Sequence, residues 1–153
     1  MNRIAMKTIF GILFFLAGMM LSAQTEKKPE MLTKETFQKK VWDFEKNPTE
    51  FIYKGDKPCI IDFYADWCGP CRKIAPYMEE FMNTYSGQIY VYKINTDQQK
   101  ELAQMFQARS IPMVLLVPMK GQPQKTVGAY PKDQYQQMIE TTLLEKPAAK
   151  IEN

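Results

Sequence analysis

The chain contains no histidine, and this absence excludes several kinds of site. Cysteine or serine nucleophiles activated by histidine cannot form, nor can metal sites with imidazole ligands. The haem-attachment motif CxxCH is excluded for the same reason. Only three cysteines occur in 153 residues, which is too few for a disulfide scaffold. Any chemistry must therefore come from a small number of side chains.

A strong excess of charge of one sign is also missing beyond residue 23. The chain has 20 basic and 17 acidic residues, but its first 23 residues hold two of the basic ones, Arg3 and Lys7, and no acidic one. The remainder has 18 basic residues against 17 acidic ones, a net charge of +1. We therefore expect no basic surface for nucleic acid.

The N-terminal 23 residues have the three parts of a secretory signal peptide. Arg3 and Lys7 form a basic start, residues 9–21 form an apolar run, and Ser22-Ala23 offers a small-residue cleavage site. The run is shorter than the ~20 residues that a membrane-spanning helix needs, so cleavage is favoured over the alternative of an uncleaved membrane anchor. No cysteine follows the run, which argues against a lipoprotein anchor.

Beyond the signal peptide, the pattern indicates one domain with short polar ends. Residues 24–32 are polar and are expected to form a flexible lead-in. Residues 33–145 are expected to form the domain, which has no internal repeat, and residues 146–153 a polar tail. A domain of this length buries a hydrophobic core without disulfide staples.

The apolar periodicity predicts helices and strands that alternate. Helical spacing begins at a Thr33 cap, and helices are expected over residues 33–46, 71–87, 98–107 and 131–143. Strands are expected over residues 51–53, 59–65, 89–95, 113–117 and 125–129. Helices between strands imply parallel crossovers, and the last two strands read as a hairpin. The expected fold class is α/β, with a central mixed β-sheet flanked by helices.

Two cysteines three residues apart, Cys68 and Cys71, lie between a predicted strand and a predicted helix. This arrangement is typical of a dithiol redox site. Side chains at positions i and i+3 of a helical turn face the same way, so a disulfide can close and open there without a large backbone movement. Partial positive charge at the helix N-terminus favours the thiolate of Cys68. Cys68 would attack a substrate disulfide, and Cys71 would resolve the mixed disulfide.

The residues around the cysteines suit this chemistry. Pro70 is tolerated in a first helical turn, where its missing N–H has no acceptor. Gly69 leaves room for a substrate chain, and Trp67 supplies a flat apolar shoulder. The alternative is that the two cysteines form half of a zinc site. Zinc would need two further ligands, and among soft ligands only Cys59 remains, so no metal is expected.

The chain resembles the thioredoxin family over roughly residues 51–144. The resemblance is carried by residues 61–76 (IDFYADWCGPCRKIAP) and continues through residues 91–95, 110–112 and 127–129. It implies the thioredoxin fold and the reduction of protein disulfides by the CGPC dithiol. It implies no cofactor apart from the redox-active Cys68–Cys71 disulfide.

Taken with the signal peptide, the resemblance points to a secreted, periplasmic bacterial thioredoxin of the type found in Bacteroides-like organisms. Its partners would be protein disulfide substrates and an electron donor. Cytosolic reductase cannot reach the periplasm, so we expect a membrane thiol-electron transporter as the donor. We expect the protein to be a monomer.

Other functions remain open from the sequence. The chain could be a disulfide oxidase or isomerase, a dedicated reductant for cytochrome maturation, or a thioredoxin-fold docking module with incidental thiols. The Gly-Pro pair between the cysteines favours reduction over oxidation. Reductants for cytochrome maturation usually carry an extra insertion in this fold, and no long insertion precedes residues 89–95.

The resemblance assigns proton transfer for the second cysteine to Asp62. Asp62 lies among apolar residues of a predicted strand, where a buried carboxyl without a partner has a raised pKa. The alternative is a solvated carboxylate at a strand end. Lys93 matches the lysine near that aspartate in the family, or else is an ordinary surface residue.

The resemblance also implies a substrate-binding rim of Trp67, Ile111, Pro112 and Gly128. Pro112 matches the family's cis-proline, which would bring the Ile111 backbone beside the cysteines, where it can pair with an extended substrate segment. Gly128 would let a partner backbone approach, unless it is a plain strand glycine. Met113 departs from the threonine usual in the family, and a soft methionine there can change substrate preference.

Cys59 is a second departure from the family pattern. At ~3.3 Å per residue it lies on the order of 20 Å from the far end of its predicted strand, which is beyond disulfide reach of Cys68. We therefore expect Cys59 to be a small buried apolar residue without a redox role.

Overall fold

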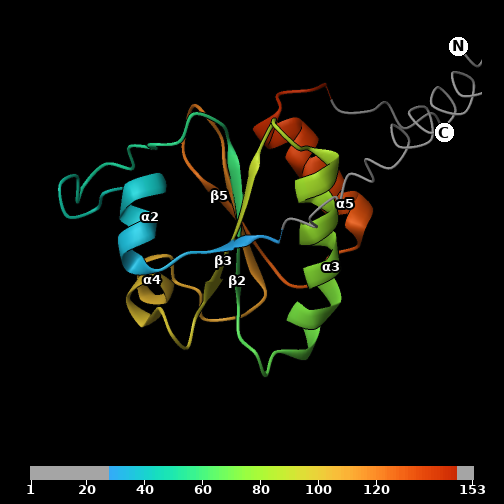
Figure 1. Cartoon of the computed structure of the whole chain (residues 1–153), viewed down its shortest axis with the longest axis horizontal. Helices are drawn as coiled ribbons and strands as arrows, with labels where there is room; N and C mark the ends of the chain where they lie inside the picture. The colour runs from blue at the N-terminus through green and yellow to red at the C-terminus, as the bar shows by residue number, and fades with distance from the viewer. Residues whose placement is uncertain (1–27, 148–153) are drawn as a thin grey trace, which may run out of the picture.

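The computed structural model describes residues 28–147 (Figure 1). The predicted signal peptide at residues 1–23, the start of the lead-in at residues 24–27 and residues 148–153 of the tail lie outside the described residues. Within residues 28–147, no helix is both long enough and apolar enough to cross a membrane.

Five strands form one sheet through the middle of the domain (Figure 1). They are β1 (Glu30–Met31), β2 (Cys59–Tyr64), β3 (Tyr90–Asn95), β4 (Met113–Val117) and β5 (Gln124–Val127). Their order across the sheet is β1-β3-β2-β4-β5. The first three strands are parallel, whereas β4 is antiparallel to β2 and β5 is antiparallel to β4. The mixed sheet and its final hairpin confirm the sequence prediction.

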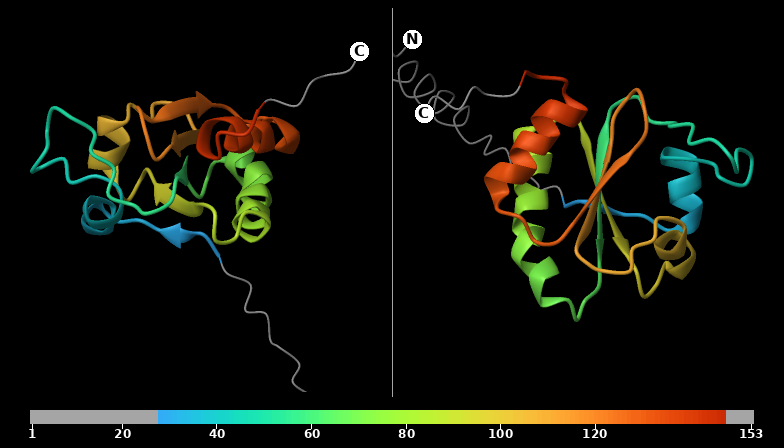
Figure 2. Two further views of the ribbon diagram at one scale, coloured as in Figure 1. Left: turned by 90° about the horizontal axis from the view of Figure 1, so that it is seen from above. Right: turned by 180° about the vertical axis from the view of Figure 1, so that it is seen from behind.

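Helices cover both faces of this sheet, as both views in Figure 2 show. One face carries α2 (Lys34–Lys40) and α4 (Lys100–Met105). The other carries α3 (Gly69–Thr84) and α5 (Lys132–Met138), which continues into a π-helical turn, η1 (Ile139–Leu143). Each face has its own apolar core, and β2 contributes Ile61 and Phe63 to one and Ile60 to the other. The predicted α/β class is therefore confirmed.

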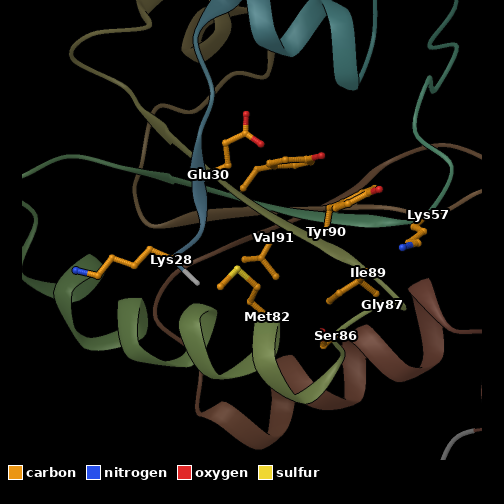
Figure 3. Close-up of a pocket in the computed structure, with 10 residues that line it drawn as sticks. Lys28, Glu30, Lys57, Met82, Ser86, Gly87, Ile89, Tyr90 and Val91 are labelled. Atoms are coloured by element: carbon orange, nitrogen blue, oxygen red, sulfur yellow. The ribbon is translucent and has the colours of Figure 1, made fainter. Parts of the chain in front are cut away.

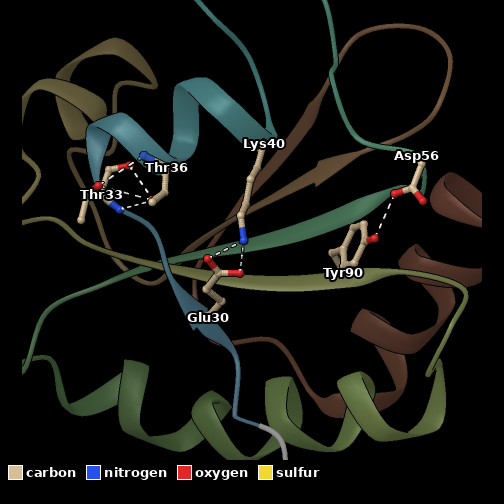
Figure 4. A network of polar contacts seen from close by, with 6 residues as sticks. All are labelled: Glu30, Thr33, Thr36, Lys40, Asp56 and Tyr90. Atoms are coloured by element: carbon tan, nitrogen blue, oxygen red, sulfur yellow. Dashed lines mark hydrogen bonds and ion pairs between the residues drawn. The ribbon is translucent and has the colours of Figure 1, made fainter.

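The structure corrects the prediction of a flexible lead-in for the last part of residues 24–32. Glu30–Met31 forms β1 beside β3, and Leu32 is buried with its N–H donating to the Lys93 carbonyl at 2.8 Å. Lys40 donates to both carboxylate oxygens of Glu30, at 2.6 and 2.7 Å (Figure 4). Both side chains of β1 are exposed, so this strand has no apolar pattern by which it could be predicted.

Helix α2 begins as predicted but ends earlier. The Thr33 hydroxyl accepts from the Thr36 N–H at 3.3 Å, and the Thr36 hydroxyl accepts from the Thr33 N–H at 2.8 Å (Figure 4). This reciprocal pair is a capping box. The helix stops at Lys40 rather than residue 46. The chain leaves the helix at Val41, and both Val41 and Phe44 are buried in the core next to α2.

The strand predicted at residues 51–53 does not form. The Phe51 ring packs against Trp42 with 5.1 Å between the ring centroids, and the Lys54 N–H donates to the Val41 carbonyl at 2.9 Å. This segment covers the end of α2 instead of extending the sheet. A short apolar run in a sequence is compatible both with a strand of the sheet and with a segment packed over a helix, so the sequence alone does not show which one forms.

Candidate active site

The two cysteines lie where β2 passes into α3, at the lower end of the sheet in Figure 1. Cys68 is the N-cap of α3, and its Sγ accepts a hydrogen bond from the Cys71 N–H at 3.2 Å. Pro70 falls in the first turn, where a missing N–H costs no helical bond. Gly69 has open space around its α-carbon, with the nearest atom that an added β-carbon would meet 3.8 Å away in the Arg72 side chain. The sequence therefore places the Cys68 sulfur at the positive end of the helix.

Cys68 and Cys71 are joined in a disulfide, with 5.3 Å between their α-carbons. Each residue is only 3% exposed. The pair packs against Ala65, with Tyr64 and Ile111 completing a small cluster separate from the two main cores. The cluster confirms that the loop before Pro112 lies beside the cysteines.

Trp67 is the most exposed large apolar side chain beside the dithiol, at 70% exposure. Its indole N–H donates to Asp97 Oδ2 at 2.9 Å. The Asp97 N–H in turn donates to the side chain of Asn95 at 3.0 Å, and Asn95 donates to Asp66 at 3.4 Å. This chain of polar contacts fixes the orientation of the exposed indole.

Asp97 was not predicted as a site residue. It follows the end of β3, and β3 is parallel to β2, so the residues after both strands meet at one edge of the sheet. The position of Asp97 beside Trp67 could therefore have been predicted only from the parallel pairing of β2 and β3.

Asp62 is fully buried on β2, and neither carboxylate oxygen has a hydrogen-bond partner among the described residues. Burial raises the pKa of Asp62 to about 6, and the charge of Lys93 opposes the rise. The alternative of a solvated strand-end carboxylate is therefore wrong. Successive strand residues alternate between faces, so Asp62 lies on the same face as Ile60, which packs in the core beneath α3 and α5.

Lys93 lies on β3 in register with Asp62. Its Nζ is 4.1 Å from the centroid of the Tyr64 ring, a cation–π contact. The side chain is half-buried rather than free on the surface. The structure thus brings Lys93 close to Asp62 while the Tyr64 ring holds its ammonium group.

The Ile111–Pro112 peptide bond is cis, as the resemblance implied. The Pro112 carbonyl accepts from the Gly128 N–H at 2.8 Å, so the two segments of the predicted rim are directly bonded. Gly128 follows the last residue of β5 and has a φ of 113°, a conformation that side chains with a β-carbon rarely adopt. It is therefore not a plain strand glycine.

Cys59 is fully buried at the start of β2, at the end of the strand away from the dithiol, and it is a free thiol. Burial raises the pKa of its thiol to about 12. A thiol in that state is a poor nucleophile. Within residues 28–147 there is also no group of three or more cysteine, aspartate or glutamate side chains placed to hold a metal ion.

A groove of about 510 Å³ lies between β1, the start of β3 and the C-terminal part of α3 (Figure 3). Met82, Ile89 and Val91 form its apolar floor, and Lys28 and Glu30 lie at its edge. Tyr90 also lines the groove, and its hydroxyl donates to Asp56 at 2.9 Å (Figure 4). The residues that line the groove include none of the site residues predicted from the sequence.

Comparison with known proteins agrees with this geometry. The family model described as "Thioredoxin" matches residues 28–141. A thioredoxin of Borreliella burgdorferi is 39% identical over 108 residues, which cover 71% of this chain and 92% of that protein. "Thioredoxin 1" of Nostoc sp. is 36% identical over 112 residues, covering 73% of this chain and 94% of that protein.

A chloroplastic M-type thioredoxin of Spinacia oleracea is 42% identical over 94 residues, covering 61% of this chain and 52% of that protein. Residues 28–141, which the family model matches, contain the dithiol turn, the buried Asp62, the cis-proline loop and Gly128. The sequence match and the geometry therefore concern the same part of the molecule. The chain therefore belongs to the thioredoxin family and is a protein-disulfide reductase that works through the Cys68–Cys71 pair.

Proposed function

We propose that the chain is an exported thioredoxin that acts as a monomer in the periplasm and reduces protein disulfides there. The observation that carries the assignment of roles is the position of Cys68 at the N-cap of α3, where its sulfur accepts the Cys71 N–H. A thiolate at this position is stabilised by the helix terminus and by that hydrogen bond. Cys68 is accordingly the attacking residue, and Cys71 is the resolving one.

The exchange proceeds in two balanced steps. The Cys68 thiolate attacks one sulfur of the substrate disulfide, a bond forms between the two sulfurs, and the other substrate sulfur leaves as a thiolate. Cys71 then loses its proton, its thiolate attacks the Cys68 sulfur, and the second substrate thiolate is expelled. Two electrons pass from the dithiol to the substrate, and the protein is left with the Cys68–Cys71 disulfide.

Asp62 is proposed to accept the proton of Cys71 in the second step. A carboxyl with a pKa of about 6 holds or releases a proton in the pH range where the exchange runs. It is buried on the α3 face of the sheet, and neither of its oxygens is bonded to another described residue, so both are free to accept a proton. Lys93 is proposed to keep this pKa from rising further.

The rim of Trp67, Ile111, Pro112 and Gly128 is proposed to bind the substrate chain. Ile111 packs against the cysteines, and Gly128, whose N–H is bonded to the Pro112 carbonyl, leaves space for an extended backbone. Trp67, the residue before Cys68, would add its exposed ring to this rim. The substrate disulfide would then lie across Cys68 with its flanking residues on apolar surface.

Export and the electron donor can be tested in one experiment. The full chain carrying Cys71→Ser is produced in bacterial cells, because the variant cannot resolve its mixed disulfides and remains linked to its partners. We expect the trapped protein in the periplasmic fraction with Gln24 as its first residue. We also expect a membrane thiol-electron transporter among the linked partners.

Recovery of the variant in the cytosol, with the signal peptide intact, would contradict export. Recovery of oxidase-pathway proteins alone would contradict the proposed donor. The same chain with Cys68→Ser as well as Cys71→Ser is the control, since it should form no mixed disulfide at this site.

A further inference from the structure

The surface next to Gly128 contains an aromatic pair that the assigned function does not use. Tyr130 is 36% exposed, and its ring stands edge-on against the ring of Tyr135, with centroids 5.9 Å apart and planes at 89°. Tyr135 itself is fully buried. An exposed aromatic ring held against a buried one loses little conformational freedom when it binds a partner.

Tyr130 flanks the open space at Gly128. A β-carbon added to Gly128 would meet the Tyr130 Cε2 at 4.0 Å and no other described atom within that distance, its chain neighbours aside. Val127, on the other side of the glycine, is 46% exposed. A polypeptide that approaches the Gly128 backbone must therefore contact apolar surface from Val127 and Tyr130.

Tyr135 connects this surface to the dithiol. Its hydroxyl donates to the Gly128 carbonyl at 2.7 Å, and the Gly128 N–H donates to the Pro112 carbonyl at 2.8 Å. Ile111, the next residue along, packs against the two cysteines. Tyr135 on α5 thus holds Gly128 through its hydroxyl and supports Tyr130 through its ring.

We propose that Tyr130 is a specificity-determining residue that contacts a large apolar side chain of the substrate near its disulfide, and that Tyr135 is its positioning residue. The proposal rests on the proposed docking of substrates along Ile111 and Gly128. The occupant is a segment of the substrate protein, because the surface is continuous with the rim around the reactive pair. An apolar side chain fits because the exposed atoms around Gly128 belong to an aliphatic and an aromatic residue.

The test uses two synthetic peptides, each closed by one disulfide, that differ only in having leucine or serine on either side of the cysteines. The wild-type protein should reduce the leucine peptide with a KM about three- to ten-fold lower than that of the serine peptide, the range expected for one aromatic contact. Tyr130→Ala should remove most of this preference without changing kcat. Tyr130→Phe should keep it, since the contact needs the ring and not the hydroxyl.

Tyr135→Phe tests the positioning role, with Tyr85→Phe as its matched control. Tyr85 is also buried, and its hydroxyl donates to Glu140 at 2.9 Å, between α3 and η1 and away from the rim. Both variants lose one tyrosine hydrogen bond and should lower the urea midpoint of unfolding similarly. Only Tyr135→Phe should raise the KM for the leucine peptide, by about two- to five-fold.

The outcomes separate the two proposals. An unchanged ratio of the two KM values in Tyr130→Ala would overturn the specificity role while leaving the reductase intact. Equal KM values in Tyr135→Phe and Tyr85→Phe would overturn the positioning role. A wild-type protein that reduces neither peptide would overturn the docking scheme on which both depend.

Discussion

Replacing Cys68 by serine is expected to lower the rate of protein-disulfide reduction by at least roughly a thousand-fold. A serine hydroxyl at the N-cap of α3 still accepts the Cys71 N–H, so the helix should remain folded. It cannot, however, form a disulfide with the substrate. The reduction of insulin, with dithiothreitol as the electron donor, measures the loss directly.

Cys59→Ala is the matched control for that experiment. Cys59 is the one free cysteine of the chain and is fully buried. Its replacement should leave the rate of insulin reduction within about two-fold while lowering stability slightly through the small cavity that it creates. Equal activity in wild type and Cys68→Ser would rule out the dithiol mechanism, and a large loss in Cys59→Ala would show that the thiol at the far end of β2 takes part.

The second large effect is expected on stability, from Asp62→Asn. The pKa of Asp62 is raised to about 6 in the folded protein from an ordinary value of 3.8, so the folded state binds the proton more tightly than the unfolded chain does. The stability that this provides is fully present below about pH 4 and is lost as the pH rises through 6. At pH 8 the buried charge therefore destabilises the fold by on the order of 3 kcal/mol.

Asparagine has the shape of the protonated carboxyl but cannot ionise. At pH 8, Asp62→Asn should accordingly raise the free energy of unfolding by about 3 kcal/mol, and at pH 4 it should change little. Urea unfolding at both pH values is the measurement. Glu50→Gln, which neutralises an exposed carboxylate, should show no such difference between the two pH values. A stability gain that is the same at pH 4 and pH 8 would show that the carboxyl of Asp62 has an ordinary pKa.

Much of the fold could be predicted because its signals are local. The apolar runs of β2, β3 and β4 are buried on both faces, and such runs predict strands without further context. The Thr33 cap and the CGPC turn likewise act within a few residues of chain. Residues 51–53 and Glu30–Met31 were predicted wrongly because their conformations depend on partners outside their own segments. Phe51 packs against Trp42, and Glu30–Met31 pairs with β3, about 60 residues further along the chain.

The residues of the site also fall into those that the sequence could predict and those that it could not. The positions of Cys68, Cys71, Asp62 and Pro112 were expected from the motif and from the family resemblance. Asp97 could have been found only by knowing that the ends of β2 and β3 meet. Tyr135 has the helical spacing of a core residue, and it is one, but nothing in that spacing predicts that its hydroxyl reaches the Gly128 carbonyl.

Reduction, rather than oxidation, of partner disulfides is the central claim, and the equilibrium reduction potential of the Cys68–Cys71 pair tests it most directly. The potential is measured by equilibrating the protein with glutathione or dithiothreitol buffers and following the fraction of oxidised protein. We expect a value close to the about −270 mV known for thioredoxin. A value near about −120 mV, as in the strongly oxidising members of the fold, would contradict the account and would identify the protein as a disulfide donor.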